Sequence, residues 1–195
     1  MYKHTNGITL RKINQDDLPV LLKMKEEGWW GTHRPLFANL SDQQRWFESI
    51  SSNSLFMMAL HDETVVGFCG YTDIRWIDRI CQVSGGSLSA STKFVKDAWA
   101  CGLDFAFEVL NMFRIEAECL EYNYPAQQLN IVQAGLIVEG RKRQAAYKCG
   151  VYYDSLVLGL LRSEWEPTGS FFDHKVASKM IARSQRNILQ LGNLQ

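Results

Sequence analysis

The chain has 195 residues, 46% hydrophobic and 22% charged, which is enough for one domain with a substantial core. Its 21 basic and 21 acidic residues cancel, which excludes a global basic field that would attract nucleic acid or an anionic membrane. The five cysteines are widely spaced without a C-x-x-C pair, which argues against a disulfide framework or a zinc site and favours a reducing, cytoplasmic compartment.

A strand and two helices are predicted first. Residues 7–13 (GITLRKI) alternate apolar and polar side chains as in a half-buried strand, and residues 14–17 supply helix-capping side chains. A helix is expected over LPVLLKMKEE, ending at Gly28. After the aperiodic segment WWGTHRPLFANL, which is interpreted as a loop, Ser41 and Gln44 have the spacing of a capping box and predict a short helix over SDQQRWFESI.

Three antiparallel strands joined as a meander are predicted next. The segments SLFMMAL, TVVGFCGYTDIRWI and ICQVSGGSL are rich in apolar, β-branched and aromatic residues, and polar residues 61–63 and 78–79 separate them. From Thr92 apolar residues recur every three or four positions, which is typical of a helix packed on a sheet. Glu108 is expected on the solvent face of this helix.

The remaining elements complete a mixed layer. RIEAECLEYN alternates as a strand, with Ile115, Ala117 and Cys119 on one face. Pro125 is expected to begin a helix that ends at Gly135, and VYYDSLVLGLL supplies the last strand. The order strand, two helices, three strands, helix, strand, helix, strand predicts an α/β (α+β) domain rather than a repeat or a bundle.

A separate C-terminal element is predicted after the domain, which is assigned to residues 1–165. Within residues 166–195, the segment FFDHKVASKMIARSQRNILQ has apolar residues at helical spacing beside four basic residues, which predicts an amphipathic helical extension. Such a helix lies back on the domain or on a second subunit of a homodimer, or it contacts a membrane surface or nucleic acid. No apolar run is long enough to predict a membrane span, and the first residues lack the apolar stretch of a secretory signal.

Three phrases resemble the GNAT superfamily, and within it the ribosomal-protein N-terminal and amino-sugar-nucleotide acetyltransferases. They are SDQQRWFESI with VVGFCGY, then GLDFAFEVLNMFRIEAECLEYN, then NYPAQQLNIVQAGLIVEGRKR with GVYYDSLVLGLL. The resemblance covers residues 7–165 and implies the GNAT fold, a mixed, mostly antiparallel sheet of six to seven strands flanked by helices and splayed between strands 4 and 5. It also implies acetyl transfer from acetyl-CoA, without a metal, to a primary amine by direct attack in a ternary complex. The implied acceptor is a protein N-terminus, a small-molecule amine or an amino-sugar nucleotide.

The resemblance also implies where CoA binds. Pantetheine would lie between the strands ICQVSGGSL and RIEAECLEYN, with a bulge expected at residues 84–86. The pyrophosphate would sit on the N-terminus of the helix after Thr92, where unpaired N–H groups and the helix dipole bind anions. The implied cofactor contacts are Ser87, Leu88, Lys93, Phe94, Val95, Lys96 and Asn123.

The sequence departs from the family's phosphate loop, Q/R-x-x-G-x-G/A. Ala90 stands at its first position, and Lys93 and Val95 stand where glycines let the backbone approach the phosphates. Either Lys93 and Lys96 supply cations to a remodelled loop, or CoA affinity is weak or absent. The family's acid tyrosine is replaced by Ile131, which a thiolate leaving group tolerates because its pKa is only about 8.5.

The candidate catalytic and acceptor residues complete the implied site. The amine must be neutral before it attacks, so Glu118, Glu121 and Asp73 are candidate bases beside Asn123, with solvated or salt-bridged surface carboxylates as the alternative. Tyr147 or Tyr152 would replace the missing acid, or would serve as half-buried packing. The residues assigned to the acceptor are Trp29, Trp30, His33, Arg34 and Asp73. The alternative for the two tryptophans is that they cover the edge of the core.

A second function stays open, a catalytically inactive binding or assembly protein with the same fold. The missing glycines, the missing tyrosine and the added C-terminal helix favour it. Transfer of another acyl group is a third alternative, because a fold alone does not determine function. Binding of CoA separates the first two functions.

Overall fold

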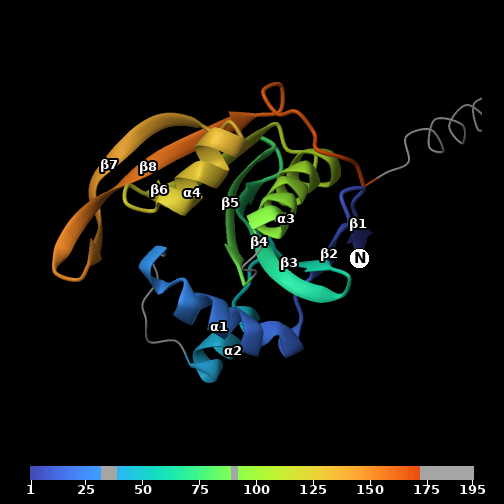
Figure 1. Cartoon of the computed structure of the whole chain (residues 1–195), viewed down its shortest axis with the longest axis horizontal. Helices are drawn as coiled ribbons and strands as arrows, with labels where there is room; N and C mark the ends of the chain where they lie inside the picture. The colour runs from blue at the N-terminus through green and yellow to red at the C-terminus, as the bar shows by residue number, and fades with distance from the viewer. Residues whose placement is uncertain (32–38, 89–91, 172–195) are drawn as a thin grey trace, which may run out of the picture.

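One sheet organises the protein. The computed structural model describes residues 1–31, 39–88 and 92–171. These residues form an eight-stranded sheet with the order β1-β2-β3-β4-β5-β6-β8-β7, and helices lie on both of its faces (Figure 1). All neighbouring strands are antiparallel except β5 and β6, which are parallel. This confirms the mixed, mostly antiparallel sheet flanked by helices.

The elements follow the predicted order. The first half contains β1 (Tyr2–Lys3), β2 (Ile8–Lys12), the turn η1 (Gln15–Asp17), α1 (Leu18–Glu27), the turn η2 (Trp29–Gly31), α2 (Leu40–Glu48), β3 (Leu55–His61), β4 (Thr64–Arg75) and β5 (Ile80–Ser87). The second half contains α3 (Thr92–Asp104), the π-helical turn η3 (Phe105–Val109), β6 (Arg114–Leu120), α4 (Tyr124–Gln127), the π-helical turn η4 (Gln128–Gln133), β7 (Ile137–Lys148) and β8 (Val151–Leu161). The described helices are all too short or too polar to span a lipid bilayer.

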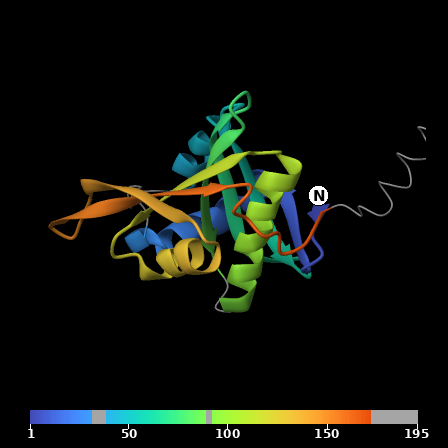
Figure 2. The same cartoon turned by 90° about the horizontal axis from the view of Figure 1, so that it is seen from above.

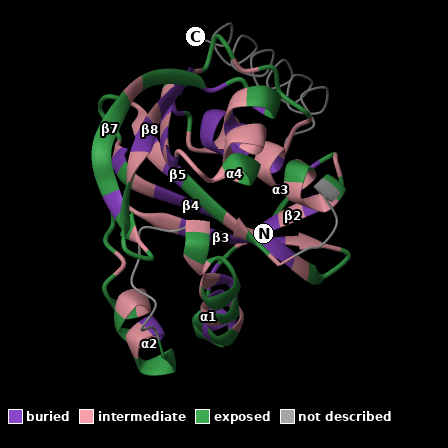
Figure 3. Ribbon diagram, turned by 60° about the vertical axis from the view of Figure 1, so that its left-hand side comes forward, coloured by how far each residue is buried: buried purple, intermediate pink, exposed green. Residues whose placement is uncertain are grey.

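The sheet has eight strands rather than six or seven because it includes β1 and β7. β1 has two residues, which is too short for a periodic pattern. β7 lies at the edge of the sheet, and Figure 3 shows it coloured mostly as exposed. A strand that is exposed on both faces does not alternate in polarity, so its sequence lacks the usual signal of a strand.

Helix capping agrees with the prediction at one helix and differs at another. Asn14 caps η1, with its side chain accepting from the Asp16 N–H at 2.9 Å. The capping box predicted for Ser41 and Gln44 is wrong. Asn39 is the N-cap of α2, and its side chain accepts from the Asp42 N–H at 3.0 Å. Asn caps a helix as well as Ser does, so two capping residues, Asn39 and Ser41, stand two positions apart in the sequence.

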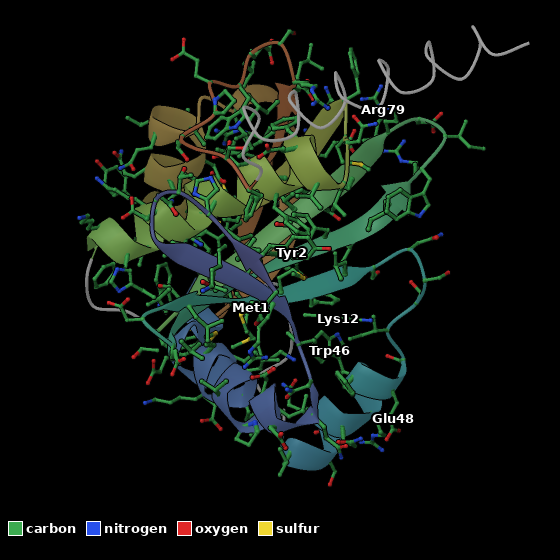
Figure 4. All side chains as sticks on the ribbon, turned by 90° about the vertical axis from the view of Figure 1, so that its right-hand side faces the viewer. Met1, Tyr2, Lys12, Trp46, Glu48 and Arg79 are labelled. Carbon is green, nitrogen blue, oxygen red and sulfur yellow. The ribbon has the colours of Figure 1, made fainter. Side chains whose placement is uncertain are left out.

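Two apolar clusters cover opposite faces of the sheet. The larger one packs α3 and η3 on the sheet, and its fully buried members include Tyr71, Leu103, Phe105 and Ile115. The smaller one lies under α1 and α2, where the Trp46 and Phe56 ring centroids are 4.9 Å apart. Figure 2 shows α3 and α4 on one side of the sheet, and Figure 4 shows Trp46 and Glu48 in the helix pair at the end of the molecule opposite Arg79.

A buried carboxylate joins both ends of the described chain to α3. Asp104 is 2% exposed, and one of its oxygens lies 3.1 Å from Nε2 of His4, next to β1. The same carboxylate accepts from Trp165 Nε1 at 2.6 Å and from the Thr168 hydroxyl at 2.7 Å. The segment after β8 therefore returns to the C-terminal end of α3.

The expectation that Glu108 lies on the solvent face is wrong. Its side chain is half-buried and accepts from the Ser170 hydroxyl and from the Phe171 N–H, the latter at 3.1 Å. The helical period alone could not show this contact, because the partners lie beyond the last strand.

Candidate active site

The sheet is open between two central strands. Parallel pairing joins Ile80–Gln82 of β5 to the first three residues of β6, 114–116. Beyond that point, residues 83–87 remain paired with β4, and residues 117–120 remain paired with β8. β1 was not predicted, so β5 and β6 correspond to the fourth and fifth predicted strands. The structure therefore confirms that the sheet is splayed between these two strands.

The bulge expected at residues 84–86 is wrong, because these residues pair with β4 in regular register. The two glycines serve close packing instead. A Cβ atom on Gly85 would lie 2.8 Å from Cζ3 of Trp99, and one on Gly86 would lie 2.6 Å from Cε1 of Phe68. The irregular register lies in β4, between Thr72 and Arg75.

The N-terminus of α3 lies near the open end of the splay, a few residues after β5 ends at Ser87. Lys93 and Lys96 in its first turns are exposed, while the ring of Phe94 lies 4.3 Å from that of His61. The α3 N-terminus can attract an anion through its unpaired N–H groups and dipole. Ala90 lies outside the described residues.

The other expected cofactor contacts are close to this end of the sheet. Ser87 is exposed at the end of β5, and Val95 is half-buried on α3. The N–H of Leu88 donates to the carbonyl oxygen of Val66 at 3.1 Å, and its side chain packs against the smaller apolar cluster. Leu88 therefore continues the contact of β5 with β4.

The turn η2 is held against the end of β6 and the β7–β8 hairpin. Three consecutive carbonyl groups each accept one side-chain hydrogen bond: Trp29 from Lys148 Nζ at 3.1 Å, Trp30 from the Tyr122 hydroxyl at 2.6 Å, and Gly31 from Asn123 Nδ2 at 3.4 Å. We call these three donors the η2 clamp. The Trp30 side chain remains 40% exposed beside the clamp, while His33 and Arg34 lie outside the described residues.

Asn123 also organises the helix that follows β6. Its Oδ1 accepts from the N–H of Ala126 at 3.2 Å, which makes it the N-cap of α4. The same amide group thus caps one helix and fixes the turn after another. Asn123 lies between β6 and α4, close to η2, so its side chain can reach both η2 and the first turn of α4.

Two of the candidate bases, Glu118 and Glu121, form hydrogen bonds and ion pairs with residues of the β7–β8 hairpin. Glu118 forms an ion pair with Lys142 and accepts from the Ser155 hydroxyl at 3.4 Å. Glu121 accepts from the Asp154 N–H at 2.8 Å and from Arg141 at 3.1 Å. The identity of these partners could not be predicted, because both cations belong to β7, whose sequence has no alternating pattern.

Asp73 lies toward the closed end of the splay. It falls within the irregular stretch of β4, and its 70% exposed side chain lies 3.6 Å from Arg75 Nε. Arg75 in turn pairs with Glu116, two residues after β6 begins. The carbonyl oxygen of Trp30 contacts Tyr122, just beyond the opposite end of β6, so the structure separates these two parts of the expected acceptor site.

The tyrosines considered as replacement acids lie at the far end of the β7–β8 hairpin. Tyr147 and Tyr152 are each 60% exposed, and their ring centroids are 5.0 Å apart. Ile131, which stands at the family's tyrosine position, packs against the larger apolar cluster. The buried thiols near α3 are unreactive, because burial raises the pKa of Cys69 to about 12 and that of Cys81 to about 12.

A sheet splayed between two parallel central strands, with a helix beginning at the open end, defines an acyl-CoA-dependent acyltransferase fold. The family model described as an acetyltransferase (GNAT) domain matches residues 8–130. The chain belongs to this GNAT acetyltransferase family. No match was found among curated proteins.

Solved structures with the same fold include spermidine N-acetyltransferases from Vibrio cholerae. One, in complex with CoA and spermine, is 16% identical, with 82% of this chain and 98% of that chain covered and a TM-score of 0.75. Another, a dodecameric form in an intermediate state, is 17% identical, with 82% and 96% covered and a TM-score of 0.69. At these identities the likeness shows the fold.

Proposed function

We propose that this protein transfers an acetyl group from acetyl-CoA to a primary amine by direct attack in a ternary complex. The splay between β5 and β6 is the observation that carries the proposal. Where two neighbouring strands part, their facing N–H and C=O groups lose their ladder partners and need others. The amide groups of a pantetheine arm can supply such partners.

The described residues at the open end fit a CoA diphosphate. The first N–H groups of α3 form an anion site, and the exposed ammonium groups of Lys93 and Lys96 add positive charge. These cations would replace the close backbone approach that glycines give in the family's usual loop. Ser87 and Leu88 precede the helix, and Phe94 and Val95 shape its first turn. Acetyl-CoA supplies the activated thioester.

Glu118 or Glu121 is proposed to take the proton of the amine, directly or through water. Asn123 is proposed to act by positioning, because its side chain holds both α4 and η2. The acceptor is proposed to enter beside Trp29, Trp30, His33 and Arg34, with Asp73 as a more distant contact. Neutral amine attack on a thioester needs little acid help, so the replacement by Ile131 is compatible with turnover.

The charges near η2 limit the acceptor class. Glu118 and Glu121 are already paired with Lys142 and Arg141, and Lys148 adds another cation at the η2 clamp. A polyamine needs carboxylates that are free to pair with several ammonium groups. The pairing therefore favours a protein N-terminus, a small amine of low charge or an amino-sugar nucleotide over the spermine of the Vibrio cholerae complex.

A catalytically inactive binding or assembly protein is the second candidate. The Trp99 ring lies directly over Gly85, within the opened part of β5, and this observation favours it. The C-terminal helical extension, residues 166–195, is proposed to contact a second subunit, although residues 172–195 lie outside the described residues.

Thermal unfolding with acetyl-CoA or CoA separates the two candidates. Ligand at a hundred times its dissociation constant should stabilise the folded enzyme by about 2.7 kcal/mol. Thiol release with a panel of amines, including spermine and a short peptide, should then identify the acceptor. The absence of any stabilisation by either ligand would reject the enzyme and leave the binding protein.

A further inference from the structure

Two buried polar atoms without a hydrogen-bond partner lie on the helices that follow β5 and β6. They are Nε1 of Trp99 on α3 and Oδ1 of Asn130 in η4. Among the described residues, two other atoms share this property, Nε2 of Gln43 on α2 and Nε of Arg75. Such atoms are rare in folded proteins, because burial removes their bonds to water without replacement.

Trp99 covers β5 where the splay has already opened. Gly85, against which its ring packs, is three residues beyond Gln82, where the pairing of β5 with β6 ends. The close contact requires glycine at this position, since a Cβ would lie 2.8 Å from Cζ3 of the ring. Trp99 therefore lines the gap from the side of α3.

Asn130 belongs to the helix on the side of β6. It is 7% exposed and lies in a π-helical turn, a feature that is frequent at functional sites. Gln127, three residues earlier, donates to the carbonyl oxygen of Glu121 at 2.7 Å, which fixes this helix at the end of β6. Figures 1 and 2 show α3 and α4 on the same side of the sheet, one beside β5 and the other beside β6 and β8.

The two atoms have complementary chemistry. An indole N–H can only donate, and an amide oxygen can only accept. An amide group in a ligand offers one acceptor and one donor, and the pantetheine arm of CoA contains two amides. We propose that Trp99 and Asn130 bind the amide groups of this arm, with Trp99 donating to a carbonyl oxygen and Asn130 accepting from an N–H.

This inference rests on the proposed binding of CoA and adds a movement to it. Both atoms are covered in the unliganded protein, so the indole must turn away from Gly85 before it can donate to a ligand. The unpartnered N–H raises the free energy of the covering position, which lowers the cost of turning the ring toward a ligand. The same ring that closes the gap then becomes part of the binding site.

The substitution Trp99→Phe tests the donor. Phenylalanine keeps an aromatic ring over Gly85 but has no N–H, so CoA should bind roughly threefold to tenfold more weakly by calorimetry. Adenosine 3′,5′-bisphosphate, which has no pantetheine, should bind equally to both proteins. Without ligand, the variant should unfold at the same temperature as the wild type or higher, because a buried unpartnered donor has been removed.

Asn130→Leu tests the acceptor in the same way, and Trp46→Phe on α2 is the matched control that should leave CoA binding unchanged. The inference is overturned if the wild type binds CoA and Trp99→Phe and Asn130→Leu bind it equally well. It is also overturned if they lose affinity for the bisphosphate to the same extent. If the wild type binds no CoA at all, the proposed function fails as well, which is a different result.

Discussion

The hydroxyl of Tyr122 donates a 2.6 Å hydrogen bond to the carbonyl oxygen of Trp30. This bond joins the end of β6 to the turn that follows α1, across 92 positions of the sequence. The Tyr122 ring is itself held by an edge contact with Tyr153, whose centroid lies 4.5 Å away. The backbone that carries the 40% exposed Trp30 is thus held from the end of the strand that borders the splay.

Tyr122→Phe should loosen η2 without unfolding the domain. The ring contact with Tyr153 is kept, while one hydrogen bond worth about 1 kcal/mol is lost. Hydrogen exchange of residues 29–31 should become faster, and the KM of the acceptor should rise more than that of acetyl-CoA. Tyr124→Phe is the control, because Tyr124 is 66% exposed. Equal exchange in both variants would show that η2 is held in place without this bond.

Glu118→Gln should lower kcat by roughly a hundredfold or more if this carboxylate takes the proton of the amine. Raising the pH should partly restore the rate, because more of the amine is then already neutral. Glu116→Gln is the matched control on the same strand, since Glu116 pairs with Arg75 and Arg114 at the closed end of the splay. Equal losses of kcat in the two variants would show that both carboxylates have a structural role only.

Gly85→Ala should destabilise the protein by about 1–3 kcal/mol, because the new Cβ meets the ring of Trp99 at 2.8 Å. Chemical denaturation measures the effect. Gly140→Ala is the control, since a Cβ on Gly140 meets nothing within 4 Å. A neutral Gly85→Ala would mean that the indole moves away at little cost.

Asp104→Ala should be among the most damaging single changes, costing roughly 3 kcal/mol or more. The side chains of His4, Trp165 and Thr168 would all lose a buried partner. Asp97→Ala, about two helical turns earlier on α3, should change the free energy of unfolding by less than about 0.5 kcal/mol. A small effect at Asp104 would indicate that water replaces the carboxylate.

Asp17 should make stability depend on acid pH. Burial opposes its ionisation, but two hydrogen bonds from Arg11 and one from the Asn14 N–H outweigh burial and lower its pKa. A carboxyl whose pKa is lower in the folded state stabilises the protein above its unfolded value of about 3.9 and loses that contribution below it. The difference in unfolding free energy between wild type and Asp17→Asn should therefore shrink as pH falls from 5 toward about 2. A constant difference across this range would contradict the ion pair.

The strands that line the core could be predicted from alternation, and β8 has the predicted bounds. Contacts between distant segments could not. Two adjacent glycines in a strand predict a bulge, whereas Gly85 and Gly86 pair regularly and make room for the rings of Trp99 and Phe68, which are not their sequence neighbours. Likewise, the sequence predicts Asn123 as a site residue. Its hydrogen bond to the Gly31 carbonyl could not be predicted, because Gly31 lies in η2, far from Asn123 in the sequence. Arg141 and Lys142, which pair with Glu121 and Glu118, belong to β7, whose sequence does not alternate between apolar and polar residues.

The carboxylate of Asp104 binds side chains from both ends of the described chain. Residues near β1 and residues after β8 hold α3 at Asp104, its last residue, and the first turn of that same helix is the proposed diphosphate site. Trimming either end would remove support from one helix, so the two losses should resemble each other. Residues near both ends of the described chain therefore support the helix at which we propose that the diphosphate binds.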